Sequence, residues 1–193
     1  MKRRILKAAA LALACMIPSV GFCGLATADG QIPEAAYHAE NEYMEIAIAE
    51  AREGIYNGDG GPFGSVIVKD GEIIGQGHNM VLANNDSTCH GEISAIRNAE
   101  AAIGSYDLTG AELYTTGEPC PMCLAACMWA RVDRVVYAAD RDDAARGGFD
   151  DRTFYELFST DRASWSTPVL QQRVPGATDP FDAWLTSAAR VDY

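Results

Sequence analysis

The sequence predicts an α/β fold in which helices cover both faces of a sheet. Short segments rich in β-branched residues alternate along the chain with longer segments of helical periodicity, and this alternation is typical of a layered α/β domain. The length of 193 residues suits one domain with a sizeable core. No internal repeat, low-complexity tract or long linker interrupts the pattern.

The first 28 residues have the composition of an export signal. Four basic residues come first, an apolar run follows as far as Leu25, and Ala26-Thr27-Ala28 forms a small-x-small cleavage pattern. A membrane anchor is the alternative, but Pro18 breaks the run, which favours removal of the segment. We therefore expect a signal peptide at 1–28, a folded domain at 29–193, and a periplasmic or secreted protein.

The first part of the folded domain predicts a helix and a hairpin. Glu34 to Tyr56 carries an apolar stripe at helical spacing, and the turn-forming residues from Asn57 to Pro62 end it. Phe63 to Lys69 and Glu72 to Gly77 predict two strands. The Asp70-Gly71 pair between them is a two-residue hairpin signal.

Two helix–strand pairs follow a loop that contains several Asn residues. Thr88 to Ile103 predicts a helix and Leu113 to Thr116 a short strand. Cys120 to Arg131 predicts a second helix, which begins after Pro119, and Arg134 to Ala139 predicts a fourth strand.

The last third of the chain predicts mainly short elements. Asp142 to Phe158 suggests helical pieces on either side of Gly147-Gly148, and Asp179 to Arg190 suggests a final helix. Pro168 to Val174 is interpreted as a fifth strand, at an edge of the sheet.

The strongest signal for chemistry combines His90, Glu92 and the Pro119-Cys120-Pro121-Met122-Cys123 segment. One imidazole and two thiolates make three zinc ligands and leave a fourth tetrahedral position for water, as in catalytic zinc sites. Glu92 lies two residues past the histidine and is not needed as a ligand. This order and spacing is the signature of zinc-dependent base deaminases, in which that Glu moves protons. Both cysteines fall in the first turn of a predicted helix, whose dipole stabilises thiolates.

Three other interpretations of these residues remain. A Cys120–Cys123 disulfide, or a thioredoxin-like redox pair, would suit an oxidising compartment, but a redox motif is expected early in a βαβ unit. A non-catalytic zinc module would bind metal without needing Glu92. Cys89 and Cys127 receive no role.

The charge of the chain argues for a small neutral substrate. The net charge is −12, and removal of the signal would leave 11 basic residues against 27 acidic ones, a net charge of −16. Such a surface repels phosphate backbones and anionic lipids, so we expect neither a nucleic acid nor a membrane as partner.

The chain resembles the cytidine deaminase-like superfamily and, within it, the bacterial guanine deaminases, from about Met44 to Tyr193. The metal motif and the Gly61-Pro62-Phe63-Gly64 stretch carry the wider likeness. Gly148-Phe149-Asp150-Asp151, Pro180-Phe181 and the terminal Tyr193 carry the narrower one. Gly91 stands where the family usually has Ala, which costs roughly 1 kcal/mol of helix propensity.

The resemblance implies a three-layer α/β/α fold with a central five-stranded mixed sheet. It also implies a homodimer in which the C-terminal segment can reach the active site of the partner. Asn79 and Asp151 are implied to be the pair that reads the base; without the resemblance, Asp151 would equally suit a helix N-cap and Asn79 a turn.

Three aromatic residues are further candidates for substrate contact. Phe63 and Trp129 could stack on a ring, although both are equally suited to the core, and Tyr193 could close the pocket. The expected reaction is zinc-dependent hydrolysis of guanine to xanthine and ammonia, with His90, Cys120 and Cys123 on the metal and Glu92 as proton carrier. Deamination of guanosine, adenine or cytosine is the alternative.

Overall fold

The computed structural model describes residues 34–192, with side chains from Asn41 onward. The predicted signal peptide at 1–28 lies outside the described residues. The chain divides into two compact units, one ending at Asp140 and the other beginning at Arg141. No helix among the described residues is long and apolar enough to span a membrane.

The first unit is built on a mixed sheet whose strands lie in the order β2-β1-β3-β4. Strand β1 (Gly64–Lys69) pairs antiparallel with β2 (Glu72–His78) and with β3 (Ala111–Gly117). Strand β4 (Arg134–Ala139) runs parallel to β3. The predicted hairpin is confirmed: Asp70 and Gly71 both have positive φ, at 53° and 80°, as a two-residue type I′ turn requires.

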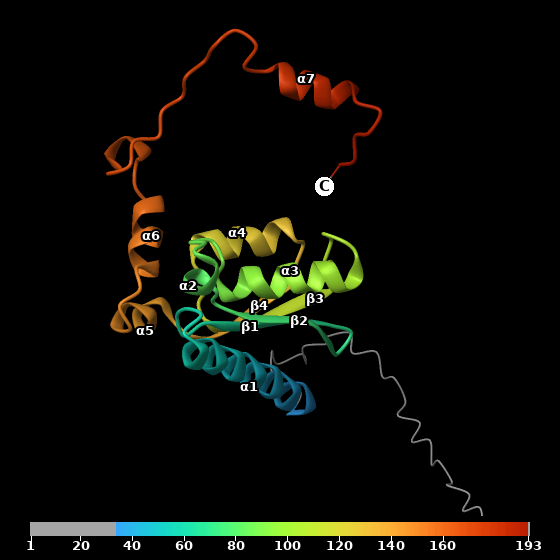
Figure 1. The fold of residues 1–193 in the computed structure, drawn as a ribbon, viewed down its shortest axis with the longest axis vertical. Helices are drawn as coiled ribbons and strands as arrows, with labels where there is room; N and C mark the ends of the chain where they lie inside the picture. Colours follow the sequence, from blue (N-terminus) through green and yellow to red (C-terminus); the bar gives the residue numbers. More distant parts are fainter. Residues whose placement is uncertain (1–33, 193) are drawn as a thin grey trace, which may run out of the picture. The chain divides into compact units, whose positions relative to one another are not determined.

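Helices cover both faces of this sheet, as Figure 1 shows. Helix α1 (Glu34–Asn57) lies on one face, and α3 (Gly91–Ile103) and α4 (Pro121–Trp129) lie on the other. Alternate residues of β1 serve the two sides, because successive side chains of a strand point to opposite faces. Val66 and Val68 pack with residues of α1, whereas Ile67 joins the core formed with α3.

Helix boundaries differ from the predicted ones in a consistent way. Helix α3 begins at Gly91 and α4 at Pro121, so His90 and Cys120 are N-cap residues and not residues of the first turn. A short helix, α2 (Val81–Asn84), occupies part of the predicted Asn-containing loop. The final helix, α7 (Asp179–Thr186), ends four residues before the expected Arg190.

The fifth strand was predicted wrongly: the sheet of the described residues has four strands. The segment from Pro168 to Val174 has no regular structure and is exposed throughout, with Leu170 86% exposed. Its β-branched and apolar residues favour an extended chain, but an extended chain becomes a strand only where it finds a partner for its backbone groups.

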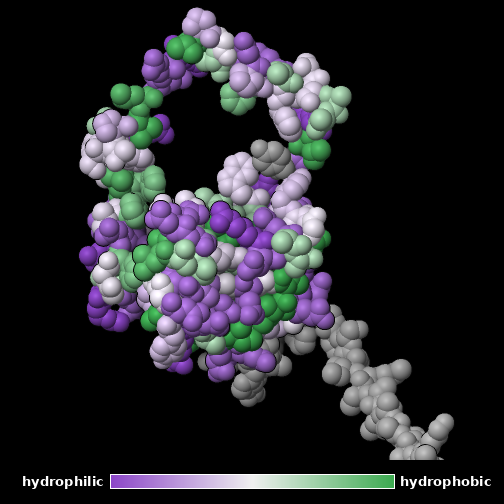
Figure 2. Space-filling model, in the orientation of Figure 1, coloured by the Kyte–Doolittle hydropathy of each residue, from purple (hydrophilic) through white to green (hydrophobic). Residues whose placement is uncertain are grey.

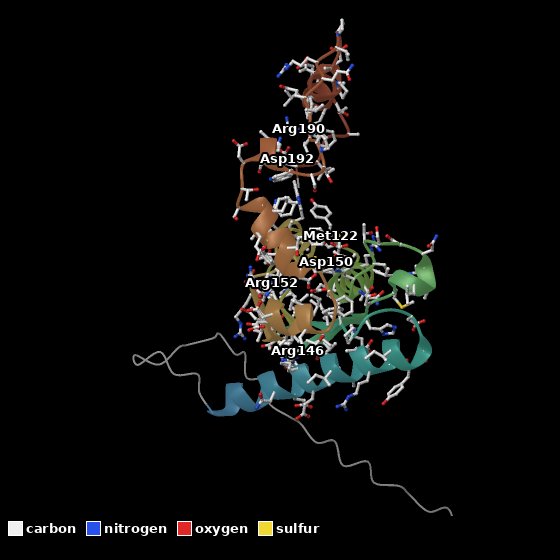
Figure 3. The ribbon with its side chains drawn as sticks, turned by 90° about the vertical axis from the view of Figure 1, so that its left-hand side faces the viewer. Met122, Arg146, Asp150, Arg152, Arg190 and Asp192 are labelled. Atoms are coloured by element: carbon white, nitrogen blue, oxygen red, sulfur yellow. The ribbon has the colours of Figure 1, made fainter. Side chains whose placement is uncertain are left out.

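The second unit contains α5 (Arg141–Arg146), α6 (Asp151–Phe158), a 3₁₀ turn (Arg162–Ser164) and α7. None of its described residues is buried, and Figure 2 shows hydrophobic side chains on its surface. Polar contacts hold its parts locally. Arg152 pairs with Asp142 at 3.1 Å. Arg190 pairs with Asp192 at 2.7 Å, and Figure 3 labels both of these residues.

Candidate metal centre

His90, Cys120 and Cys123 come together as the sequence predicts. His90 Nδ1 lies 3.7 Å from Cys120 Sγ and 3.5 Å from Cys123 Sγ, and the two sulfurs are 3.6 Å apart. A tetrahedral ion with Zn–S bonds of about 2.3 Å and a Zn–N bond of about 2.0 Å needs separations of about 3.8 Å and 3.5 Å. The three ligand atoms therefore fit zinc, and the sulfurs are too far apart for a disulfide of about 2.05 Å.

Two helix N-termini hold these ligands. His90 is at the N-cap position of α3 and Cys120 at that of α4, and Cys123 is the third residue of α4. Pro121 occupies the first helical position, where its missing N–H and fixed φ cost nothing. The free N–H groups and positive dipole ends of both helices favour negative charge on the sulfurs.

The pKa values of the two thiols shift in opposite directions. The hydrogen bond between the two sulfurs, outweighing partial burial, lowers the pKa of Cys120 to about 4. The same hydrogen bond, together with burial, raises the pKa of Cys123 well above its usual range. These shifts favour a thiolate at Cys120, and a dication held by both sulfurs would stabilise the thiolate form of Cys123 as well.

Glu92 lies in the first turn of α3 and is 4% exposed. Burial is the main reason that the pKa of its carboxyl rises to about 7, with the negative charge of Cys120 adding to the effect. A carboxyl group with that pKa can both accept and release a proton near neutral pH, which suits an acid–base catalyst.

Gly91 allows α3 to approach the start of β1 closely. A Cβ atom on this residue would lie 2.9 Å from the carbonyl oxygen of Phe63, closer than Cβ atoms pack. The departure from the usual Ala therefore has a structural reason: the backbone of Phe63 occupies the space of that methyl group.

Asn79 and Phe63 lie beside the ligand segment. The N–H of Asn79 donates to the carbonyl of Phe63 at 2.8 Å, and the N–H of Met80 donates to the carbonyl of Cys89 at 2.8 Å. The Phe63 ring covers Gly117, where a Cβ would lie 3.1 Å from two ring carbons. Asn79 is 5% exposed, and its Oδ1 accepts from the N–H groups of Gly61 at 3.3 Å and Val81 at 3.2 Å.

Of the other three predicted contact residues, one belongs to the first unit, one to the second unit, and one is outside the described residues. Trp129 is the last residue of α4 and 64% exposed, six residues past Cys123, or about 9 Å along the helix axis. Asp151 is the first residue of α6, in the second unit, and Asp150 takes the N-cap position that Asp151 was thought able to fill. Tyr193 lies outside the described residues.

The sequence pattern assigns no role to two residues near this site, Cys127 and Gly60. Cys127 is 2% exposed, belongs to the core between α3 and the sheet, and has a pKa raised to about 12 mainly by burial. Gly60 packs on the side chain of Asn79. The Gly60-Gly61-Pro62 run signals a turn, but only the fold shows what the turn contacts.

The fold and the three-ligand cluster with its buried carboxyl define a zinc-dependent hydrolytic deaminase. Comparison with known proteins agrees. The family model for the cytidine and deoxycytidylate deaminase zinc-binding region matches residues 37–139, more than half of the chain, and the chain belongs to this family.

Relatives within the family include enzymes for free bases and for tRNA. The chain is 44% identical over 151 residues to guanine deaminase of Bacillus subtilis, covering 78% of this chain and 97% of that enzyme. The crystal structure of the same enzyme superposes with a TM-score of 0.76 and covers 79% of this chain and 98% of that one. A tRNA-specific adenosine deaminase of Agrobacterium fabrum is 45% identical over 97 residues, covering 50% of this chain and 63% of that enzyme.

The prediction of a periplasmic or secreted protein is wrong. The alignment takes in 97% of the Bacillus guanine deaminase, which leaves too little of that enzyme to hold a counterpart of a 28-residue leader. A basic start followed by an Ala-rich run is a signal of composition only, and the relationship to this enzyme outweighs it.

Proposed function

We propose that this protein hydrolyses guanine to xanthine and ammonia. The observation that carries the proposal is the ligand cluster, which fits three corners of a tetrahedron and has the buried Glu92 two residues past His90, in the first turn of α3. The preference for guanine rests on the near-complete coverage of the Bacillus guanine deaminase, because the alignment with the tRNA enzyme covers only half of this chain.

Glu92 is the proton carrier of the proposed mechanism. Zinc held by His90, Cys120 and Cys123 supplies Lewis acidity that lowers the pKa of a water molecule. The Glu92 carboxylate takes a proton from the attacking water and delivers it to a ring nitrogen. It then helps to protonate the amine that leaves as ammonia, so that guanine and water give xanthine and ammonia.

Asn79 and Asp151 are the proposed readers of the base. Two backbone N–H groups already occupy Oδ1 of Asn79, which leaves its Nδ2 to donate to an acceptor on the purine edge. The Asp151 carboxylate would accept from the N–H groups of guanine. Phe63, which lies between Asn79 and Gly117, is the proposed stacking surface. Trp129 and Tyr193 remain predicted contacts.

We further propose a homodimer with exchange of the C-terminal segment, within a deaminase domain that extends to residue 193. The described part of the second unit buries none of its own residues. Phe181, Trp184 and Leu185 of α7 are 68%, 41% and 61% exposed, and such an apolar helix is normally covered by protein. Light scattering would give the mass. Mixing inactive Glu92→Ala with a chain truncated after Asp140 should restore activity if the tails are exchanged.

Ammonia release from a substrate panel tests the reaction. We expect turnover of guanine above guanosine, adenine and cytosine, and no deamination of tRNA, because a net charge of −12 repels a polyphosphate. Preferred turnover of another member of the panel would replace guanine as the substrate. Zinc binding without any turnover would instead indicate a non-catalytic zinc module.

A further inference from the structure

Asn79 is held by a loop that packs directly on its side chain. A Cβ on Gly60 would lie 2.1 Å from Asn79 Oδ1, so that only glycine fits at this position. The next residue, Gly61, donates its N–H to the same oxygen. The direction of the Asn79 amide therefore depends on where this loop sits.

His78, the residue before Asn79, joins that loop to helix α1. Its Nε2 lies 3.0 Å from Asp59 Oδ2 in the loop, and its Nδ1 lies 3.2 Å from Glu50 Oε2 in α1. A neutral imidazole donates from one nitrogen only, whereas an imidazolium can donate to both carboxylates. Arg97 of α3 is the other charged residue that lines the surface pocket with His78 and Glu50.

The ring of His78 packs closely against helix α1. A Cβ on Gly54 of α1 would lie 2.6 Å from the ring carbon Cδ2, so that glycine lets the ring lie against the helix. The carbonyl of Asp59 accepts from the N–H groups of Leu82 and Ala83, at 2.9 and 3.0 Å. Asp59 thus contacts the chain on both sides of Asn79, through His78 before it and α2 after it.

We propose that His78 is a positioning residue for Asn79. Its imidazolium, fixed between Glu50 and Asp59, holds the 59–61 loop against the Asn79 amide and so directs Nδ2 toward the base. The action is indirect, because neighbouring residues of an extended chain point to opposite faces and His78 faces α1. This inference rests on the proposed reading of the base by Asn79.

A double-mutant cycle in the zinc-loaded enzyme tests the coupling. We expect His78→Gln to raise KM for guanine about tenfold and to leave kcat within about twofold, as when an interaction common to ground and transition states is weakened. In an Asn79→Ala background the same change should have almost no effect on KM, because its target is gone. The matched control is Gln76→Ala, which removes the other partner of Glu50 at 2.7 Å and leaves both His78 contacts in place.

His78→Ala is a second variant, and added imidazole tests it by chemical rescue. His78 borders a pocket of about 480 Å³, so added imidazole can reach the space that His78→Ala leaves. Millimolar imidazole should return KM toward the wild-type value in His78→Ala and do nothing in His78→Gln. Equal effects of His78→Gln on KM with and without Asn79 would overturn the proposal.

A spectroscopic measurement separates this inference from the proposed substrate. The chain has three histidines, so ¹⁵N spectra of His78 can be assigned by substitution, and we expect both ring nitrogens to carry hydrogen. Hydrogen exchange at the Gly61 amide should accelerate in His78→Gln and not in Gln76→Ala. The wild-type protein could show both expected results and still not deaminate guanine. The proposed substrate would then be wrong, but the His78 clamp, meaning its contacts with Glu50 and Asp59, would be supported. A neutral ring, or unchanged exchange, rejects the clamp itself.

Discussion

Glu92 is the residue whose chemistry is easiest to isolate. It is buried at the second position of α3 and is not among the three ligand residues, so its removal should separate catalysis from metal binding. We expect Glu92→Gln to lower kcat for guanine by about 10²- to 10⁴-fold with the zinc content unchanged. Turnover and metal analysis on the same sample check this. A Gln variant with wild-type activity would remove Glu92 from the mechanism.

Gly91 allows a test of the close approach between α3 and β1. Alanine there would gain about 1 kcal/mol of helix propensity, but its methyl group would meet the Phe63 carbonyl at 2.9 Å. Because displaced backbone costs about 1 to 3 kcal/mol, we expect Gly91→Ala to be less stable than wild type in urea unfolding. A more stable variant would show that the strand end yields at little cost.

For single residues, the sequence predicts which side chains gather at a metal site better than it predicts close packing contacts. The gathering of His90, Cys120 and Cys123 could be predicted because metal chemistry ties residue types to spacing. The roles of Gly60 and Gly91 could not, because each depends on a backbone or side-chain atom from a segment about 20 to 30 residues away. No local pattern encodes such an approach.

Among the elements, strands β3 and β4 are joined by an ion pair that makes stability depend on pH. Arg134 donates to both carboxylate oxygens of Glu112, at 3.0 and 2.7 Å, and Tyr114 donates to Oε2 at 2.8 Å. Partial burial raises the pKa of Glu112, but the hydrogen bonds and the Arg134 charge outweigh it and leave the pKa below its usual 4.5.

The sign of that pH dependence follows directly. A depressed folded pKa means that the stabilisation is present above about pH 4.5 and is lost as the pH falls through the folded pKa. Both side chains are more than a third exposed, so we expect Glu112→Gln to cost only about 0.5 to 1 kcal/mol at pH 7. Urea unfolding at pH 7 and pH 3.5 should show this difference shrinking at the lower pH. A constant difference would assign the effect to packing.

Elements with a local signal were predicted well, and the one that needed a partner was not. The Asp70-Gly71 turn and the amphipathic α1 carry their own determinants, and both are confirmed. Helix starts shifted because a cap residue belongs to the helix in sequence pattern but not in φ and ψ. Pro168 to Val174 has strand-like residues but pairs with no strand of the described chain.

For the whole molecule, zinc should contribute to stability as well as to catalysis. The ligands come from the starts of two helices, and binding of a ligand to the folded state alone adds about 4 kcal/mol when its concentration is 1,000 times Kd. We expect a chelator to lower Tm by about 10 °C, and added zinc to restore it. Calorimetry checks this. An unchanged Tm after verified metal loss would mean that the cluster is rigid without the ion.

Whole-molecule properties were the least predictable from the sequence. The three layers follow from alternating periodicity, which each segment displays by itself. Export was inferred wrongly from the composition of the first residues. The alignment that covers 97% of the Bacillus guanine deaminase corrected it. Oligomeric state depends on what covers helices such as α7, and residue patterns along one chain do not contain that information.

The thiols of Cys120, Cys123 and Cys127 offer a way to measure how much of the protein has bound metal. Trypsin cleavage after Arg97 and Arg131 releases one peptide that carries Cys120, Cys123 and Cys127. In stripped protein, an alkylating label would attach to the Cys120 thiolate, and a bound ion would block it. Cys127, buried in the core with its pKa near 12, stays unlabelled in both states and serves as the internal standard. Mass spectrometry of that single fragment would therefore count filled and empty centres in crude extracts, before any purification step could add or remove zinc.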